Sequence, residues 1–211
     1  MGIPVLILGE SGSGKTTSLR NFEPDEVSIF NVAGKPLPFK KKLPKLSTSD
    51  YEIIKSEMKK SPKKSFVIDD SQYLLAFALF DKAKETGYGK FTDMALDFKN
   101  LITFVIKQLP KDVVVYFLHH VEVTETGKIK AKTTGKMLDN QLTVEGLFSI
   151  VLMATTDGIN HNFITQSDGY TTCKSPMEML EMVMDNDLKL VDTKIRDYWE
   201  LNNTKNEGEK Q

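Results

Sequence analysis

The sequence is poor in the residues that build disulfide frameworks and zinc sites. Its 211 residues include one cysteine, Cys173, and three histidines, His119, His120 and His161. A single cysteine excludes a disulfide framework and any metal site built from several thiolates. The first apolar run, residues 3–8, is far too short to span a bilayer and lacks the basic flank of a signal peptide. We therefore expect a soluble, cytoplasmic protein without a membrane partner.

The chain also lacks an excess of charge of either sign. It has 28 lysines and arginines against 29 acidic residues, which gives a formal net charge of -1 at pH 7. This balance excludes a wholly basic nucleic-acid binder, so any contact with a nucleic acid must come from a local basic patch. Arginine is rare, with only Arg20 and Arg196 in the chain. Enzyme classes that use several arginines to neutralise phosphates are therefore disfavoured.

Apolar runs alternate with helix-like segments along the chain. Five runs have the composition of buried strands: residues 3–8, 27–32, 65–68, 112–118 and 148–154. Helical patterns cover residues 15–23, 51–60, 74–84, 95–109, 176–183 and 193–201. Residues 162–166 and 170–174 predict a late antiparallel β-hairpin. We expect one α/β domain over residues 1–201, with a mostly parallel sheet flanked by helices, and a polar tail over 202–211.

Residues 9–16 fit the pattern G-x-x-x-x-G-K-[ST] at every fixed position, directly after a predicted strand and at the start of a predicted helix. The glycines let backbone N–H groups wrap around a phosphate. Lys15 supplies a positive charge for the β- and γ-phosphates of ATP, and Thr16 offers its hydroxyl to Mg²⁺. The predicted nucleotide-binding residues are Gly9, Glu10, Ser11, Gly12, Ser13, Gly14, Lys15, Thr16 and Thr17.

A second signal lies about fifty residues later, where the apolar strand 65–68 ends in Asp69-Asp70. A P-loop enzyme needs a carboxylate at this point to hold Mg²⁺, and a second group to orient or deprotonate the attacking water. We favour Asp69 as the Mg²⁺ partner and Asp70 as the catalytic residue that polarises water. The sequence leaves the reverse assignment open.

Two histidines, His119 and His120, follow the apolar strand 112–118. Polar residues at strand ends in open α/β sheets face the ligand crevice, so we predict His119 as a catalytic or sensing residue near the γ-phosphate. We interpret His120 as a turn residue. A lysine-rich segment follows, and we predict that it is a flexible loop that binds nucleic-acid phosphates. Its predicted contacts are Lys128, Lys130, Lys132 and Lys136.

Together these residues resemble the RecA-like P-loop ATPases of bacteriophages, which keep only the ATPase core, over roughly residues 3–200. The resemblance implies a RecA-like fold and a DNA-stimulated ATPase that binds single-stranded DNA in phage replication or recombination. It also implies a ring or filament of identical subunits and a phage single-strand-binding or replication protein as partner. Two features depart from the pattern. The strand 27–32 ends in Ala33-Gly34, without the glutamate that RecA-type ATPases usually carry there. These ATPases also often use a basic residue from a neighbouring subunit, a basic finger, and the candidates for it in this chain are Arg196 and the lysines.

Several alternatives share the glycine-rich loop. A nucleotide-gated interaction module that rarely hydrolyses ATP accommodates the missing glutamate. A AAA+-type loader with little hydrolysis of its own is a further alternative, although the two arginines and the length of 211 residues count against it. A small-molecule kinase is less favoured, because its lid and acceptor site need more arginines than this chain has. A GTPase is disfavoured because the guanine-reading sequence N-K-x-D is absent.

Overall fold

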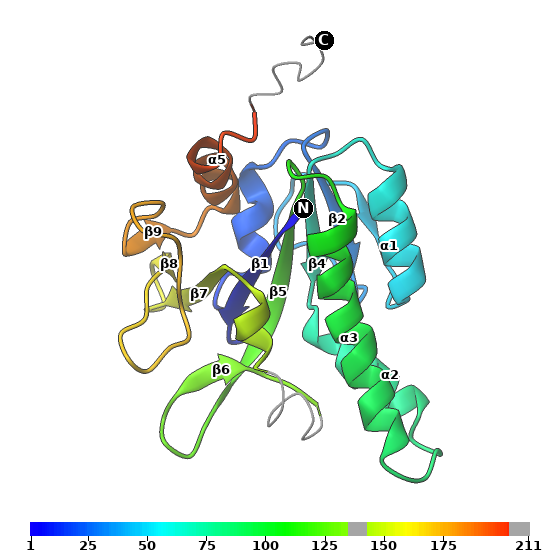
Figure 1. Cartoon of the computed structure of the whole chain (residues 1–211). Coiled ribbons are helices and arrows are strands. Elements are labelled where there is room, and N and C mark those ends of the chain that lie inside the picture. The colour runs from blue at the N-terminus through cyan, green and yellow to red at the C-terminus, as the bar shows by residue number, and fades with distance from the viewer. Residues whose placement is uncertain (135–142, 203–211) are drawn as a thin grey trace, which may run out of the picture.

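A computed structural model describes residues 1–134 and 143–202 of the chain. Its sheet has the strand order β3-β2-β4-β5-β1-β7-β8-β9, and β6 pairs with β5 outside this path (Figure 1). The six strands β3, β2, β4, β5, β1 and β7 run parallel to one another, whereas β8 and β9 are antiparallel additions at one edge. The strands are β1 (Ile3–Gly9), β2 (Val27–Asn31), β3 (Lys45–Leu46), β4 (Ser65–Asp69), β5 (Val114–Val123), β6 (Ile129–Ala131), β7 (Ile150–Thr156), β8 (His161–Ile164) and β9 (Val183–Asp185).

Helices cover both faces of this sheet. On one face α1, α2 and α3 pack over a core that includes Ile54, Leu75 and Phe98. On the other face η1 and α5 pack over a second core that includes Leu19 and Ile195 (Figure 1). The helices are η1 (Thr16–Asn21), α1 (Tyr51–Lys60), α2 (Gln72–Asp81), α3 (Gly89–Gln108), η2 (Val144–Leu147) and α5 (Leu188–Tyr198), of which η1 and η2 are short 3-10 helices.

The central strands are apolar on both sides because both faces of the sheet are covered. In β5 the side chains from Val114 to Leu118 are fully buried, and they alternate between the two cores. All parallel strands present their carboxyl ends at the same edge of the sheet, where the chain leaves β1 and β4. Ligands bind at this edge in open α/β folds, so the fold places the predicted nucleotide residues where a ligand site is expected.

The predicted α/β class and the mostly parallel sheet are confirmed, but several elements differ. The chain after Lys15 forms only the short helix η1. The segment 176–183 is not a helix, and its end begins the edge strand β9 instead. The predicted hairpin is wrong in its pairing. Residues 161–164 pair with β7 and β9, while 170–174 make isolated bridges to Ile129 and Val151. From residue 203 onward the predicted tail lies outside the described residues.

Candidate nucleotide-binding site

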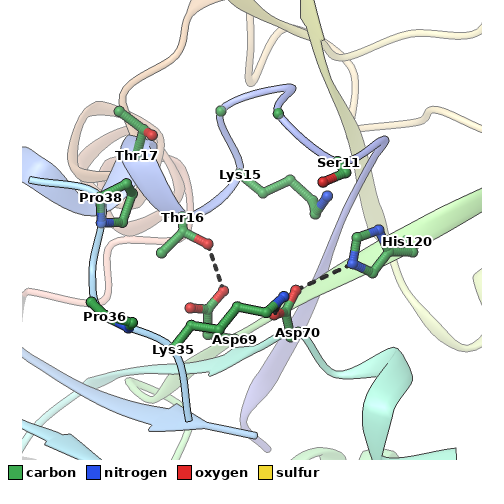
Figure 2. Close-up of a pocket in the computed structure, with 12 residues that line it drawn as sticks. Ser11, Lys15, Thr16, Thr17, Lys35, Pro36, Pro38, Asp69, Asp70 and His120 are labelled. Carbon is green, nitrogen blue, oxygen red and sulfur yellow. Dashed lines mark hydrogen bonds and ion pairs between the residues drawn. The ribbon is translucent and has the colours of Figure 1, made fainter. Parts of the chain in front are cut away.

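A pocket opens at the carboxyl edge of the sheet, between the glycine-rich loop (residues 9–16) and the ends of β2, β4 and β5 (Figure 2). It joins residues that lie far apart in the sequence, because β5 lies between β1 and β4 in the sheet. Two thirds of its lining comes from the predicted nucleotide-binding residues and from Asp69 and Asp70, and the rest from residues 35–38 and from His120. The lining residues are Ser11, Gly12, Gly14, Lys15, Thr16, Thr17, Lys35, Pro36, Pro38, Asp69, Asp70 and His120.

The glycine-rich loop needs its glycines for conformation and for space. Gly12 and Gly14 have φ angles of 83° and 95°, in the region that side chains rarely adopt. A Cβ on Gly14 would also lie 2.9 Å from Nδ1 of His161, so β8 packs directly against the loop. Of the other predicted loop residues, Gly9, Glu10 and Ser13 are not part of the pocket lining, and the buried hydroxyl of Ser13 has no hydrogen-bond partner among the described residues.

Lys15 is the buried cation of the pocket. Its ammonium group donates hydrogen bonds to the carbonyl oxygens of Gly9, at 2.7 Å, and Glu10, at 2.8 Å. Burial lowers the pKa of Lys15 to about 8, although Asp70 and Asp69 act to raise it. A phosphate would give this desolvated ammonium the negative partner that two neutral carbonyls do not supply.

Thr16 and Asp69 form the pair that fits a magnesium ion. The Thr16 hydroxyl donates to Oδ1 of Asp69 at 2.8 Å, which leaves the lone pairs of the threonine oxygen for a cation. Mg²⁺ in phosphate sites takes one or two carboxylates together with substrate phosphates and waters. In the described parts of the chain, no group of three or more His, Cys, Asp and Glu side chains could hold a metal alone. The donor set therefore fits an ion that is bound jointly with a nucleotide.

The two aspartates after β4 lie in different electrostatic environments. Burial raises the pKa of Asp69 to about 6, against the opposing effect of the bond from Thr16. Burial also acts to raise the pKa of Asp70, but contacts with His120 and Lys35 outweigh it and lower that pKa to about 2. Asp70 adopts a left-handed conformation with φ 59°, which is strained for a residue with a side chain. The strained turn directs its carboxylate into the pocket.

Lys35 and His120 hold that carboxylate from two sides (Figure 2). The ammonium of Lys35 lies 2.9 Å from Oδ2 of Asp70, and Nε2 of His120 lies 3.3 Å from Oδ1. The imidazole of His120 also meets the ring of Tyr73 edge-on, with 5.8 Å between the ring centroids. Asp70 is therefore an ionised carboxylate with two basic neighbours.

His119, predicted as the catalytic histidine, is fully buried and does not line the pocket. Its Nε2 lies 2.8 Å from the carbonyl oxygen of Lys132, so Nε2 must carry the proton and donate it. Nδ1 then accepts from the hydroxyl of Ser71, at 2.9 Å. Burial lowers the pKa of His119 to about 4, which keeps this ring neutral. His119 thus joins the residue after Asp70 to the lysine-rich segment.

His120 lines the pocket and His119 does not, the reverse of the prediction, and strand geometry explains this placement. The ladder pairs β5 with β1 as far as Gly9 opposite His120, and β5 itself continues to Val123. The histidines are thus inside the strand and not at its tip, and successive side chains point to opposite faces. His119 lies with Phe98 of α3, at 5.8 Å between ring centroids, while His120 faces the glycine-rich loop.

The lysine-rich segment begins as a hairpin rather than as a flexible loop. β6 pairs with β5 in register Glu122–Lys130, and these two side chains form an ion pair of 2.9 Å. Lys128 and Lys132 are exposed near the two ends of β6. Figure 1 shows the hairpin projecting beyond the carboxyl end of β1. Lys136 lies outside the described residues.

Both arginines are engaged within their own chain. Arg196 donates to Oδ2 of Asp192 at 2.7 Å and to the carbonyl oxygen of Asp112 at 2.9 Å, at the opposite end of the sheet from the pocket. Arg20 donates to the carbonyl oxygens of Asn186, at 2.5 Å, and Thr17, at 3.3 Å. Arg196, which the sequence offered as a basic finger, is thus committed to a structural network.

Four residues that line the pocket are not among the predicted site residues: Lys35, Pro36, Pro38 and His120. Lys35 stands just beyond the strand that lacks the expected glutamate, and that departure was the available signal. Its link to Asp70 spans thirty-five residues of chain and follows only from the adjacency of β2 and β4.

No model of a known protein family matches the chain, and no curated protein is significantly similar to it. None of the helices in the described part of the chain is long and apolar enough to cross a membrane.

Proposed function

We propose that this protein is a RecA-like P-loop ATPase that binds Mg·ATP at the carboxyl edge of its sheet. One observation carries the proposal: Lys15, Thr16 and Asp69 meet in one pocket although fifty residues separate the loop from the carboxylate. Such a loop at a strand–helix junction, with a hydroxyl and a carboxylate at its mouth, is the arrangement used to hold nucleotide phosphates with magnesium.

In this mechanism each residue has a defined task. Lys15 exchanges its bonds to loop carbonyls for the β- and γ-phosphates. Thr16 and Asp69 hold the ion, which when bound neutralises the phosphate charge. Asp70, ionised at neutral pH, accepts a hydrogen bond from the attacking water and orients it. The water oxygen bonds to the γ-phosphorus, and the bond to the β–γ bridging oxygen breaks, which gives ADP and inorganic phosphate.

The proposed action is on single-stranded DNA in phage replication or recombination, with a phage single-strand-binding or replication protein as partner and identical subunits in a ring or filament. The β5–β6 hairpin supports the DNA contact, because Lys130 lies on β6, Lys128 and Lys132 flank it, and β6 pairs with the strand that carries His120 into the pocket. His119 extends this connection, since it bonds both Ser71 and the backbone of Lys132. Loss of the γ-phosphate from the pocket would thus be transmitted through β5 to the lysines that we propose bind DNA.

A nucleotide-gated interaction module is the second candidate. It is favoured by the segment that follows β2, residues 32–35, which carries Lys35 into the pocket and contains no acid that would activate water. Such a protein would bind Mg·ATP and hydrolyse it rarely, and a AAA+-type loader with little turnover would behave in the same way.

Steady-state ATP hydrolysis by the pure protein, with and without single-stranded DNA, separates these candidates when Lys15→Ala is measured beside it. We expect hydrolysis that DNA stimulates and that Lys15→Ala abolishes. Binding of Mg·ATP without turnover would favour the module instead. Equal turnover in wild type and Lys15→Ala would exclude this pocket as the site.

A further inference from the structure

The backbone of Lys35 is held in place at the wall of the pocket. Its carbonyl oxygen accepts hydrogen bonds from the side-chain amide of Asn31, at 2.5 Å, and from the ammonium of Lys45, at 3.1 Å. Gly34, with φ 71°, makes the turn that brings the chain from β2 to this position. Pro36 and Pro38 continue the same wall, so the chain that carries Lys35 is stiff where it borders the pocket.

The side chain of Lys35, in contrast, is largely exposed to solvent. It is 60% exposed, with its ammonium 2.9 Å from Asp70 and 5.1 Å from the centroid of the Tyr73 ring. Water solvates the exposed ammonium when it leaves, and Asp70 keeps its contact with Nε2 of His120 at 3.3 Å. Lys35 can therefore leave Asp70 at little cost, whereas Lys15 is buried and bonded to two carbonyls of its own loop.

The other described residues add little positive charge to the pocket. Transfer of a γ-phosphoryl group builds negative charge that enzymes stabilise with arginine or lysine in addition to the loop lysine. Arg20 and Arg196 are both bonded within their own chain, and neither lines the pocket. Among the described residues that line it, Lys15 and Lys35 are the lysines (Figure 2).

We propose that Lys35 is a catalytic residue, a second lysine of the same chain that moves from Asp70 to the γ-phosphate and stabilises the charge that develops there during hydrolysis. This inference rests on the proposed ATPase function and deepens it, since it replaces a basic finger from a neighbouring subunit with a lysine that follows β2 in the same chain. It also gives the missing acid at the end of β2 a reason: the position delivers a cation to the phosphate, while Asp70 on the adjacent strand is the acid that faces the water.

The test separates binding from chemistry in Lys35→Ala and Lys35→Arg, with Lys42→Ala as the control. Lys42 is exposed in the same basic segment and does not line the pocket. The dissociation constant of Mg·ATP and the single-turnover hydrolysis rate are measured for each protein. We expect Lys35→Ala to bind within about threefold of wild type but to hydrolyse about 10²-fold to 10³-fold more slowly, as when a transition-state donor is removed. Lys35→Arg should recover part of the rate, and Lys42→Ala should match wild type.

The possible failures are distinguishable. If wild type hydrolyses ATP and Lys35→Ala does so at the same rate, the role of Lys35 is wrong while the ATPase function stands. Weaker binding of Mg·ATP with an unchanged single-turnover rate at saturating ATP would also overturn it, because this would make Lys35 a residue of ground-state binding only. If wild type does not hydrolyse ATP at all, the ATPase function fails, and the inference about Lys35 fails with it.

Discussion

Two buried aspartates at opposite ends of the sheet have very different surroundings. Asp192 on α5 lies at the amino end of the strands. It accepts hydrogen bonds from Ser65 at 2.9 Å, Tyr116 at 2.8 Å and Arg196 at 2.7 Å. Its negative charge is thus matched by a guanidinium and by two further donors, which is the usual way for a folded protein to bury a carboxylate.

Asp69, at the carboxyl end, is held much less well. It accepts a bond from the Thr16 hydroxyl at 2.8 Å, lies next to a second carboxylate, and has a pKa that burial raises to about 6. Asp70 beside it is strained at φ 59°. Groups that a fold leaves strained or incompletely paired mark the places where a ligand completes the structure. Asp192 is therefore a carboxylate that stabilises the fold, whereas Asp69 has the surroundings expected of the magnesium-binding carboxylate that we propose.

The largest effect is expected from Asp192→Asn. The exchange keeps the shape of the side chain but leaves the guanidinium of Arg196 buried without its counter-charge. Breaking a buried pair in this way costs about 3–5 kcal/mol of stability. Urea unfolding would show the loss, and the double exchange of Asp192→Leu with Arg196→Met should recover most of it. Unchanged stability in Asp192→Asn would remove the distinction between the two ends.

The same exchange at the other end, Asp69→Asn, should act in the opposite direction on stability. The folded pKa of Asp69 lies above the unfolded value, so the ionised carboxylate destabilises the fold at pH values above about 6. We expect a gain of about 1–3 kcal/mol at pH 8 from removing this charge. ATP hydrolysis should fall about 10²-fold or more, because the magnesium partner is lost. A destabilised Asp69→Asn that keeps its activity would contradict both assignments.

His119 lies at the carboxyl end of the sheet, next to His120, but it is buried behind the pocket. Its pKa is lowered to about 4 by burial, against 6.5 for a free histidine. Between these pH values the unfolded chain binds the proton that the folded chain refuses, so this group weakens folding as the pH falls from about 6.5 to 4. The loss amounts to about 3 kcal/mol at pH 4.

His119→Gln keeps one donor and one acceptor but does not titrate. Urea unfolding at pH 7.5 and pH 4 should therefore show a loss of stability about 3 kcal/mol smaller than in wild type. An identical loss in both proteins would mean that His119 is protonated in the folded state, and the neutral bridge between Ser71 and Lys132 would be wrong.

The smallest effect concerns the β5–β6 hairpin. Changing Lys128, Lys130 and Lys132 together to alanine should reduce the salt dependence of binding to single-stranded DNA. The slope of log affinity against log salt should become less steep by about 2, as expected for three lost phosphate contacts. Fluorescence anisotropy at several salt concentrations measures this slope. An unchanged slope would remove the hairpin from the DNA-binding surface.

Much of the fold could be predicted because the decisive signals were local. Apolar runs predicted the buried strands, and both ends of the helix Tyr51–Lys60 were predicted correctly. Its periodic apolar residues are accompanied by the N-cap of Asp50, which accepts from two backbone N–H groups. The predictions that were wrong concern segments whose secondary structure depends on pairing with a strand elsewhere in the sequence. Val183–Asp185 is a strand because β8 lies beside it, and no pattern within the segment itself reveals that neighbour.

The candidate site divides in the same way. The glycine-rich loop and Asp69 could be predicted from the sequence, because the fixed spacing of the motif identifies the loop and the end of an apolar strand identifies Asp69. Which of His119 and His120 faces the pocket depends on where β5 ends and on the face of the sheet to which each side chain points. Two consecutive polar residues do not show in the sequence which of them lies on which face. Lys35 reaches the pocket only through the order of strands in the sheet.

The central claim is that the carboxyl-edge pocket binds Mg·ATP through Lys15. Isothermal titration calorimetry of wild type and Lys15→Ala, with circular dichroism to establish that both are folded, tests it most directly. We predict one site per chain in wild type and an affinity at least tenfold weaker in Lys15→Ala. The same dissociation constant in both proteins, or no binding by folded wild type, would contradict it.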